Sequence, residues 1–84
     1  MFIIDTMKSS KEHTTNIAEK LGHKIRIERM KRKMSQERLA ELAQLNRNFI
    51  GMVERGETNI TVKNLVNISI AFDIKIQDLF DFVL

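Results

Sequence analysis

The 84-residue sequence contains no cysteine, proline, tryptophan or tyrosine, and it has only three glycines. Without cysteine the chain can form neither disulfide bonds nor thiolate metal sites, and its absence suits a reducing compartment. The lack of proline and the scarcity of glycine, which occurs only at Gly22, Gly51 and Gly56, favour helices over a turn-rich β fold.

Long apolar segments are also missing. The apolar stretch in residues 1–7 is interrupted by Asp5. It is too short to be the core of a signal peptide or to span a membrane. We therefore expect a soluble, cytoplasmic protein with no membrane partner. His13 and His23 have no third ligand, so no metal or cofactor is expected. No glycine-rich phosphate loop, nucleophile set or ligand-pocket signature indicates an enzyme or a small-molecule site.

Basic residues are concentrated in the first half of the chain. Ten of the fourteen lysines and arginines lie in residues 1–40, against five of the eleven acidic residues, although the net charge is only +3. This asymmetry indicates a face directed at a polyanion. The basic run 31–33 can equally complement the dipole at the C-terminal end of a solvated helix. Charge alone leaves both interpretations open.

Hydrophobic periodicity predicts an all-α chain. Residues 1–13 are assigned to an N-terminal leader that can be flexible, and residues 14–84 to one domain. Glu28 falls on the apolar stripe of the first helix, where an apolar residue is easier to bury. Ser35, Asn46 and Thr61 are suitable N-caps for the next three helices. The expected helices span residues 15–33, 36–43, 47–55 and 62–72, followed by a short helix that holds Ile76, Leu79 and Phe80.

Residues 35–56 have the packing pattern of a helix-turn-helix. Ala40 allows two short helices to cross closely, and Ile50 and Val53 bury one side of the second helix. The opposite side is then turned outward, where a recognition helix contacts bases in the major groove of DNA. Gly51 would let this helix approach the groove closely. The residues expected to face outward are Asn46, Arg47, Asn48, Gly51 and Met52.

The outward side chains suit recognition of double-stranded DNA. Arg47 can pair with guanine O6 and N7, and Asn46 or Asn48 can pair with adenine. Asn46 is equally suited to act only as a helix cap. Met52 can contact a thymine methyl group, and Gln36 can reach a phosphate from the first turn of its helix.

The combined pattern resembles the Cro/C1-type, or xenobiotic-response-element-type, helix-turn-helix family. It reads Ile25-Arg26-x-x-Arg29, then Ser35-Gln36-x-x-Leu39-Ala40, then Asn46-Arg47-x-x-Ile50-x-x-Val53-Glu54-Arg55-Gly56. Within that family, residues 46–51 followed by Asn59-Ile60-Thr61 are similar to the controller proteins of restriction–modification systems. The resemblance covers about residues 21–80 and implies a five-helix, lambda-repressor-like DNA-binding domain.

The resemblance also implies which residues bind DNA. By position, Gln36, Arg47, Asn48, Phe49 and Asn59 would contact DNA, and Arg55 is a further candidate for a phosphate. Phe49 stands where controller proteins frequently have tyrosine, so any hydrogen bond from that hydroxyl is lost, and core packing is its alternative role. Lys33 and Gln44 stand where the family often has glycine. Each would cost about 1 kcal/mol if it adopts the left-handed conformation.

The sequence thus predicts a regulator that binds a pseudo-palindromic operator as a homodimer, as a restriction–modification controller would, with RNA polymerase as a further candidate partner. A phage-type repressor or an antitoxin regulator would share this chemistry, and a helical protein-interaction module is the alternative from another class. The apolar residues of the C-terminal third either complete the monomer core or form a dimer interface, and we expect the interface. Those residues are Val66, Ile70, Phe80, Phe82, Val83 and Leu84.

Overall fold

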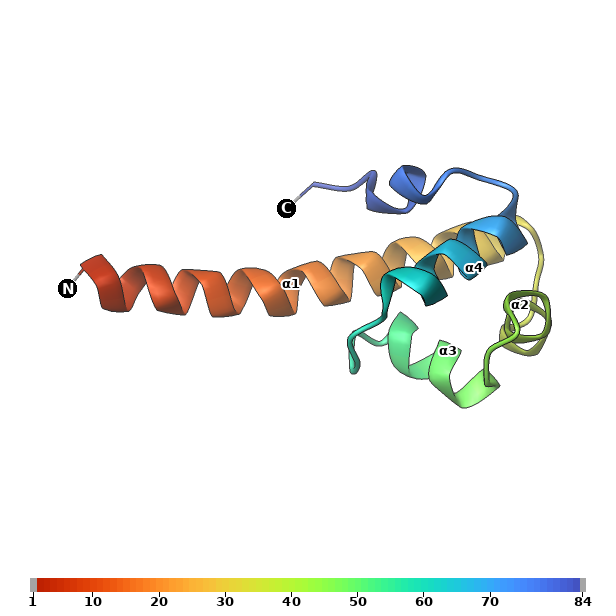
Figure 1. Cartoon of the computed structure of the whole chain (residues 1–84), viewed down its shortest axis with the longest axis horizontal. Helices are drawn as coiled ribbons and strands as arrows, with labels where there is room; N and C mark the ends of the chain where they lie inside the picture. The colour runs from red at the N-terminus through yellow and green to blue at the C-terminus, as the bar shows by residue number, and fades with distance from the viewer. Residues whose placement is uncertain (1, 84) are drawn as a thin grey trace.

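Four α-helices and one short 3₁₀ helix make up the computed structural model, which describes the backbone of residues 2–83 and the side chains of residues 17–83. No strand occurs over residues 2–83, so the predicted all-α class is confirmed. Helices α2 to α4 pack beside the C-terminal half of α1, and the N-terminal half of α1 extends away from them (Figure 1). The elements are α1 (Phe2–Lys31), α2 (Gln36–Ala43), α3 (Arg47–Glu54), α4 (Val62–Phe72) and the 3₁₀ helix η1 (Ile76–Phe80).

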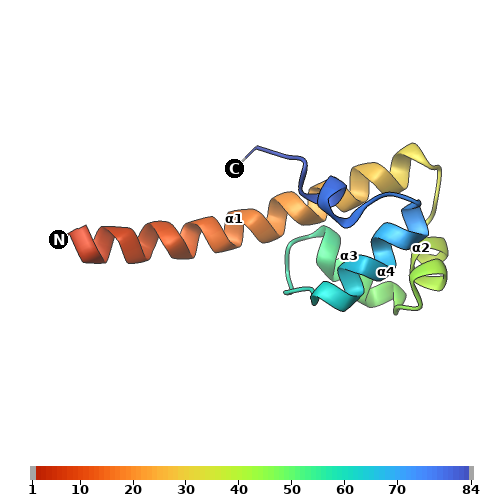
Figure 2. The same ribbon diagram turned by 45° about the horizontal axis from the view of Figure 1, so that its top comes forward.

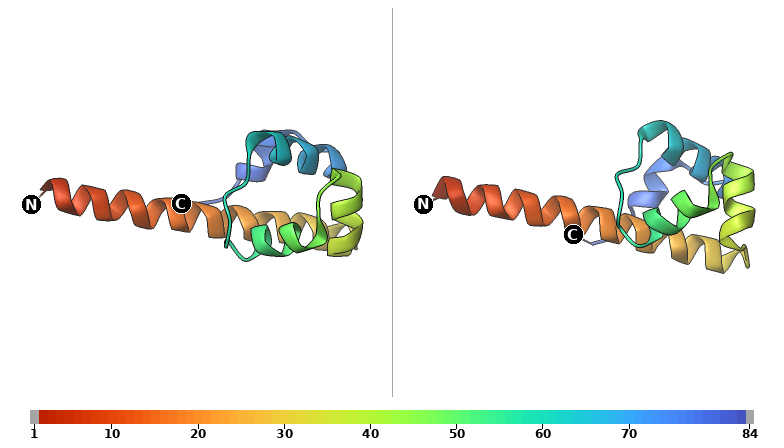
Figure 3. Two further views of the ribbon diagram at one scale, coloured as in Figure 1. Left: turned by 60° about the horizontal axis from the view of Figure 1, so that its bottom comes forward. Right: turned by 90° about the horizontal axis from the view of Figure 1, so that it is seen from below.

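Helix α1 is longer than the sequence pattern predicts. The expected start near Thr15 is wrong, because the helical backbone continues unbroken from Phe2 to Lys31. No proline or glycine precedes Gly22, so nothing interrupts propagation of the helix. The molecule is therefore elongated, with a long axis of 48 Å against 22 and 21 Å (Figure 3). The side chains of residues 1–16 lie outside the described residues, and the leader over residues 1–13 stays a prediction.

The expected fifth α-helix is a 3₁₀ helix instead. Asp73 ends α4 in the left-handed conformation, with φ 58° and ψ 46°, and Asp81 leaves helical geometry with φ −77° and ψ 78°. The helical part of the segment between them is only five residues long, and 3₁₀ hydrogen bonding is found mainly in such short pieces. The lambda-repressor-like expectation of five α-helices is thus corrected to four α-helices over residues 2–83.

One hydrophobic core joins all five elements, and Figure 2 shows how the backbones of these elements are arranged. Every element contributes one large side chain that is almost completely buried. Because a buried core side chain contacts many neighbours at once, these residues fix the position of each helix relative to the others. In chain order they are Ile25, Leu39, Ile50, Ile68 and Leu79.

Helices α1 and α3 cross at a distance that requires glycine. A Cβ atom at Gly22 would lie 2.1 Å from the carbonyl oxygen of Val53 and 3.0 Å from that of Glu54. Such contacts are far inside van der Waals separation, so only a residue without Cβ permits this crossing. Gly22 therefore sets how closely α3 packs against α1.

Three helices end at residues other than glycine in the left-handed region. The φ angles are 54° at Lys33, 57° at Gln44 and 58° at Asp73. Lys33 and Gln44 thus adopt the conformation implied by their alignment with family glycines. This conformation costs about 1–2 kcal/mol for a residue with a Cβ atom.

Glu28, the acidic residue on the apolar stripe of α1, is the centre of an ion cluster. Its carboxylate lies 2.9 Å from Arg32, 3.0 Å from Lys24 and 3.2 Å from Lys31. Burial raises the pKa of Glu28, but hydrogen bonds from the three cations outweigh burial and lower the pKa from 4.5 to about 2. Arg32 also donates to the carbonyl oxygen of Phe72 at 3.2 Å and lies 4.8 Å from its ring centroid. The cluster thus connects α1 to the C-terminal end of α4.

Candidate DNA-binding surface

The helix-turn-helix predicted from the sequence is formed by α2 and α3. Ser35 Oγ accepts a hydrogen bond from the backbone N–H of Arg38 at 2.9 Å, and Asn46 Oδ1 accepts one from the N–H of Asn48 at 2.7 Å. These bonds satisfy free donors at the start of each helix. Leu45, in the turn, is half-buried against the core. The predicted bounds of α2 are confirmed, and α3 ends one residue before the predicted position.

A hydrogen-bonded network around Glu54 holds three helices together. Arg29 of α1 donates to both carboxylate oxygens of Glu54, at 2.7 and 3.1 Å, and to the carbonyl oxygen of Met34 at 2.7 Å. Gln36 of α2 donates its side-chain amide to Glu54 Oε1 at 3.1 Å. The Glu54 side chain is only 3% exposed, so water screens these charge-assisted bonds little. The network therefore fixes α3 against α1 and α2.

A hollow of about 310 Å³ lies over the outer face of α3. It brings together residues from α2, from α3 and from the C-cap of α3. The sequence pattern predicts this grouping, because it places these residues on the outward side of the helix-turn-helix. Six of the nine predicted DNA-binding residues line it. They are Gln36, Arg47, Asn48, Gly51, Met52 and Arg55.

Both arginines that line the hollow form ion pairs through Nε. Arg47 Nε lies 3.5 Å from Glu37 Oε1, and Arg55 Nε lies 3.0 Å from Glu57 Oε2. All four side chains are more than half exposed, so solvent screens the pairs and both guanidinium groups are accessible.

Gly51, which was expected to face outward, is buried. A Cβ atom there would lie 3.1 Å from Nη1 of Arg55 and 3.9 Å from its Cζ. The guanidinium of Arg55 thus lies over Gly51 and forms part of the hollow's floor. Contact of Gly51 with DNA stays a prediction.

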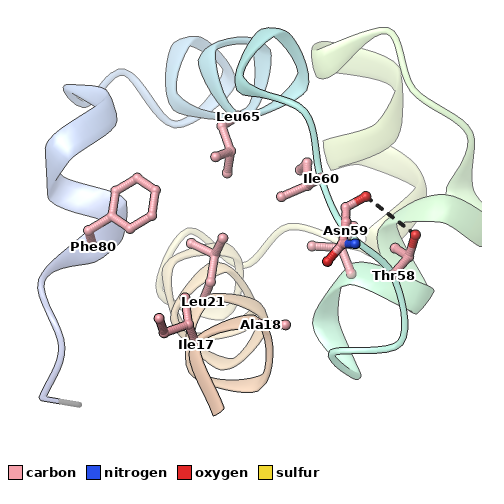
Figure 4. Close-up of a pocket in the computed structure, with 9 residues that line it drawn as sticks. Ile17, Ala18, Leu21, Thr58, Asn59, Ile60, Leu65 and Phe80 are labelled. Atoms are coloured by element: carbon pink, nitrogen blue, oxygen red, sulfur yellow. Dashed lines mark hydrogen bonds between the residues drawn. The ribbon is translucent and has the colours of Figure 1, made fainter. Parts of the chain in front are cut away.

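Three predicted DNA-binding residues lie outside the hollow. Asn46 uses its side-chain oxygen as the cap of α3, and Phe49 is half-buried against the core. Asn59 precedes α4 and lines a separate groove (Figure 4). These positions support the capping role of Asn46 and the packing role of Phe49, and contact of all three with DNA stays a prediction.

The separate groove lies between α1, the loop before α4, α4 itself and η1, and has a volume of about 350 Å³. Figure 4 shows Leu21 and Leu65 directed toward each other across it, with Phe80 at its η1 side. Its lining is mainly apolar. The groove offers apolar contact area rather than a set of convergent polar groups.

An exposed apolar stripe follows one side of α4. Val62, Val66 and Ile70, four residues apart, are 70%, 37% and 68% exposed. Phe80 and Val83 are also exposed, whereas Phe82 is half-buried against the core. Val62 was not predicted, although its four-residue spacing from Val66 could have identified it. Leu84, also predicted for the interface, lies outside the described residues.

Two other features are absent from the part of the chain that the structure describes. No group of three or more histidine, cysteine, aspartate or glutamate side chains is placed to hold a metal ion there. Nor does any helix there have the length and apolar character needed to cross a membrane.

The family pattern described as a helix-turn-helix matches residues 25–79, which is most of the chain and includes α2 to α4. The protein therefore belongs to the helix-turn-helix family, as its sequence resemblance and the packing of α2 and α3 indicate. This is a regulatory, DNA-binding family.

Within that family, the chain belongs with the control proteins of restriction–modification systems. Control protein C.BamHI of Bacillus amyloliquefaciens is 41% identical over 70 residues, covering 82% of this chain and 86% of that protein. Control protein C.SmaI of Serratia marcescens is 38% identical over 64 residues, covering 76% of each. The crystal structure of the restriction-modification controller protein C.AhdI from Aeromonas hydrophila has a TM-score of 0.74 at 38% identity, covering 75% of this chain and 96% of that one. The predicted family and subfamily are confirmed.

Proposed function

We propose that the protein is a homodimeric transcriptional regulator of a restriction–modification operon, and that it inserts α3 into the major groove of a pseudo-palindromic operator. The observation that carries the proposal is the hollow on α3, where Gln36, Arg47, Asn48 and Arg55 are gathered on one exposed face. The Glu54 network supports it, because a recognition helix must keep a fixed orientation to contact particular bases.

Each polar residue of the hollow has a chemical role in the proposed complex. Arg47 donates to guanine O6 and N7, and Asn48 pairs with adenine N6 and N7. One N–H of the Gln36 amide is used by Glu54, which leaves the second for a phosphate oxygen. Arg55 contacts a second phosphate. These contacts combine recognition of bases with fixed placement on the DNA backbone.

Restriction–modification control is supported by the relatives of the chain, which are control or controller proteins. Action on an operator in the cytoplasm follows from that role. Contact with RNA polymerase would accompany activation, whereas simple occupancy of the operator would suffice for repression.

The dimer interface is proposed to form along the α4 stripe and the adjoining C-terminal residues. Val66, Ile70, Phe80 and Val83 expose apolar area that the monomer leaves uncovered. Pairing two copies through this area would bury it and place two α3 helices for half-sites about one helical turn apart.

Binding can be tested by a mobility-shift assay on the DNA upstream of the protein's own gene. Arg47→Ala should weaken binding by about 1–3 kcal/mol and relax preference at one base position in each half-site. The matched control is Arg38→Ala, because Arg38 is an exposed arginine of α2 that lies outside the hollow. Equal effects of both substitutions would contradict the assignment of α3. No specific shift at moderate salt, from a folded dimer, would favour the protein-interaction module.

The interface can be tested by sedimentation equilibrium. Ile70→Lys should shift the protein toward monomer, because a charge would be buried in the apolar contact. Met30→Lys is the control, since Met30 is 55% exposed on α1 and lies outside the proposed interface. A dimer of unchanged stability in Ile70→Lys would show that the two copies meet elsewhere.

A further inference from the structure

Glu37 lies beside the proposed base-contacting arginine. Its Oε1 is 3.5 Å from Nε of Arg47, so the pair joins the first turn of α2 to the start of α3. This distance is too long for a good hydrogen bond, and the two side chains are 76% and 57% exposed. A pair of this kind contributes little to folding stability. We therefore expect the Glu37–Arg47 pair to affect which groups of the DNA Arg47 contacts, more than how stably the protein folds.

The pair occupies only one part of the arginine head group. Contact at Nε leaves both terminal amino groups, Nη1 and Nη2, for other acceptors. Two parallel donors are what an arginine uses to contact O6 and N7 of guanine together. Glu37 can thus hold the Arg47 guanidinium while its base-contacting groups remain available.

Arg55 repeats the arrangement on the other side of the hollow, with Glu57 at Nε. Arg38, an exposed arginine of α2 outside the hollow, differs because Glu41 contacts its Nη1. Closest approach at Nε is therefore common to the two arginines that line the hollow, and it is not shared by Arg38. The buried Arg29–Glu54 pair also meets at Nε, but there Nη2 donates to the same carboxylate as well.

We propose that Glu37 is a specificity-determining residue, which positions Arg47 for guanine and weakens its contact with phosphates; this rests on the proposed DNA-binding function. An arginine without such a partner is free to bind the phosphates of any sequence. The Glu37 carboxylate also repels phosphates wherever the helix sits out of register. Sequences that lack the preferred guanine are thereby bound more weakly.

Glu37→Gln tests this, with Glu41→Gln as the matched control. Both substitutions remove one exposed carboxylate from α2, but Glu41 contacts Arg38 and lies outside the hollow. The probes are a duplex that the wild-type chain selects from a random pool, and a random-sequence duplex of equal length. Affinities for both are measured by fluorescence anisotropy over a range of salt concentrations, after circular dichroism has shown that each variant is folded.

Glu37→Gln should bind the random duplex more tightly and lower the preference for the selected duplex by about tenfold, within the range of one bidentate base contact. Its salt dependence on the random duplex should steepen by about 0.9 per protomer, because Arg47 gains a phosphate. Glu41→Gln should change both affinities together and keep their ratio within about twofold.

A double-mutant cycle separates positioning from simple charge. In an Arg47→Ala background, Glu37→Gln should leave the preference unchanged, because the residue it positions is absent. An unchanged preference in Glu37→Gln, an equal loss in Glu41→Gln, or a persistent effect without Arg47 would each overturn the proposal. If the wild-type chain selects no sequence, the DNA-binding function itself fails.

Discussion

Removal of the Glu54 charge should destabilise the entire helix-turn-helix. Glu54→Gln keeps the size of the side chain but leaves the Arg29 guanidinium without its carboxylate. The two side chains are 3% and 13% exposed, so water cannot readily replace the lost partner. Arg29 would retain its hydrogen bond to the Met34 carbonyl oxygen at 2.7 Å and one bond to the neutral amide oxygen, but no carboxylate would balance its charge. The substitution therefore strands a largely buried charge between α1 and α3.

The expected loss is large for a chain of this size. Breaking one partner of a buried ion pair costs about 3–5 kcal/mol. The neutral amide can still accept one hydrogen bond from Arg29, which favours the lower end of that range. Since each kcal/mol lowers the Tm of a domain this small by about 4–8 °C, Glu54→Gln should melt at least about 12 °C below wild type.

Urea unfolding followed by circular dichroism measures this loss. Protomer concentration must be held constant, because dimerisation would add a concentration-dependent term to stability. The matched control is Glu57→Gln, whose pair with Arg55 at 3.0 Å is about half exposed and should contribute less than about 1 kcal/mol. If Glu54→Gln costs no more than Glu57→Gln, burial does not strengthen the pair and the reasoning is refuted.

Three further outcomes follow from other contacts. Gly22→Ala should lower the free energy of unfolding by about 1–3 kcal/mol or more, because its Cβ would lie 2.1 Å from the Val53 carbonyl oxygen. Denaturant titration measures this loss, and unchanged stability would mean that α1 and α3 can move apart at little cost. Acid should weaken the fold through Glu28, because its pKa in the folded protein is lowered from 4.5 to about 2. The stability contributed by its ionised carboxylate is complete above about pH 4.5 and is lost as the pH falls toward 2. Glu28→Gln should therefore flatten this part of the stability–pH curve. Asn46→Ala should cost about 1 kcal/mol and Asn46→Ser much less; if Ser restores stability but not operator affinity, Asn46 also contacts a base.

Helix limits set by local chemistry could be predicted from the sequence. The N-caps Ser35, Asn46 and Thr61 each receive the hydrogen bond expected of them, because capping involves residues only two or three positions apart. The start of α1 could not be predicted in the same way. Threonine can cap a helix or continue one, and nothing nearby in the sequence decides between the two.

Contacts between segments far apart in the sequence could not be predicted from local patterns. The close crossing at Gly22 depends on how near α3 approaches, which no local pattern encodes. Arg29 and Glu54 both belong to the family-like motif, but their bond joins residues 25 positions apart and its burial is visible only in the packed structure. The position of Glu28 on the apolar stripe has a local explanation instead, because its three cationic partners lie three or four residues away on the same helix.

The candidate DNA-binding surface was predicted in outline. Burial of Ile50 and Val53 fixes which side of α3 is exposed, so the positions of Arg47, Asn48 and Met52 followed from helical periodicity. The pairing of Arg47 with Glu37 was not predicted, because it depends on how α2 and α3 approach each other. The pairing of Arg55 with Glu57 is local, but it depends on the backbone conformation after α3.

The left-handed residues that end three helices make this chain open to engineering. Lys33, Gln44 and Asp73 line neither the hollow nor the α4 stripe, yet each holds a backbone conformation that glycine adopts more easily. Replacing each with glycine should stabilise the fold by up to about 1 kcal/mol per site, without changing any side chain that lines the hollow. These three positions affect folding stability without lining the hollow. A more stable variant could therefore be made by changing them while the candidate DNA-binding surface stays the same.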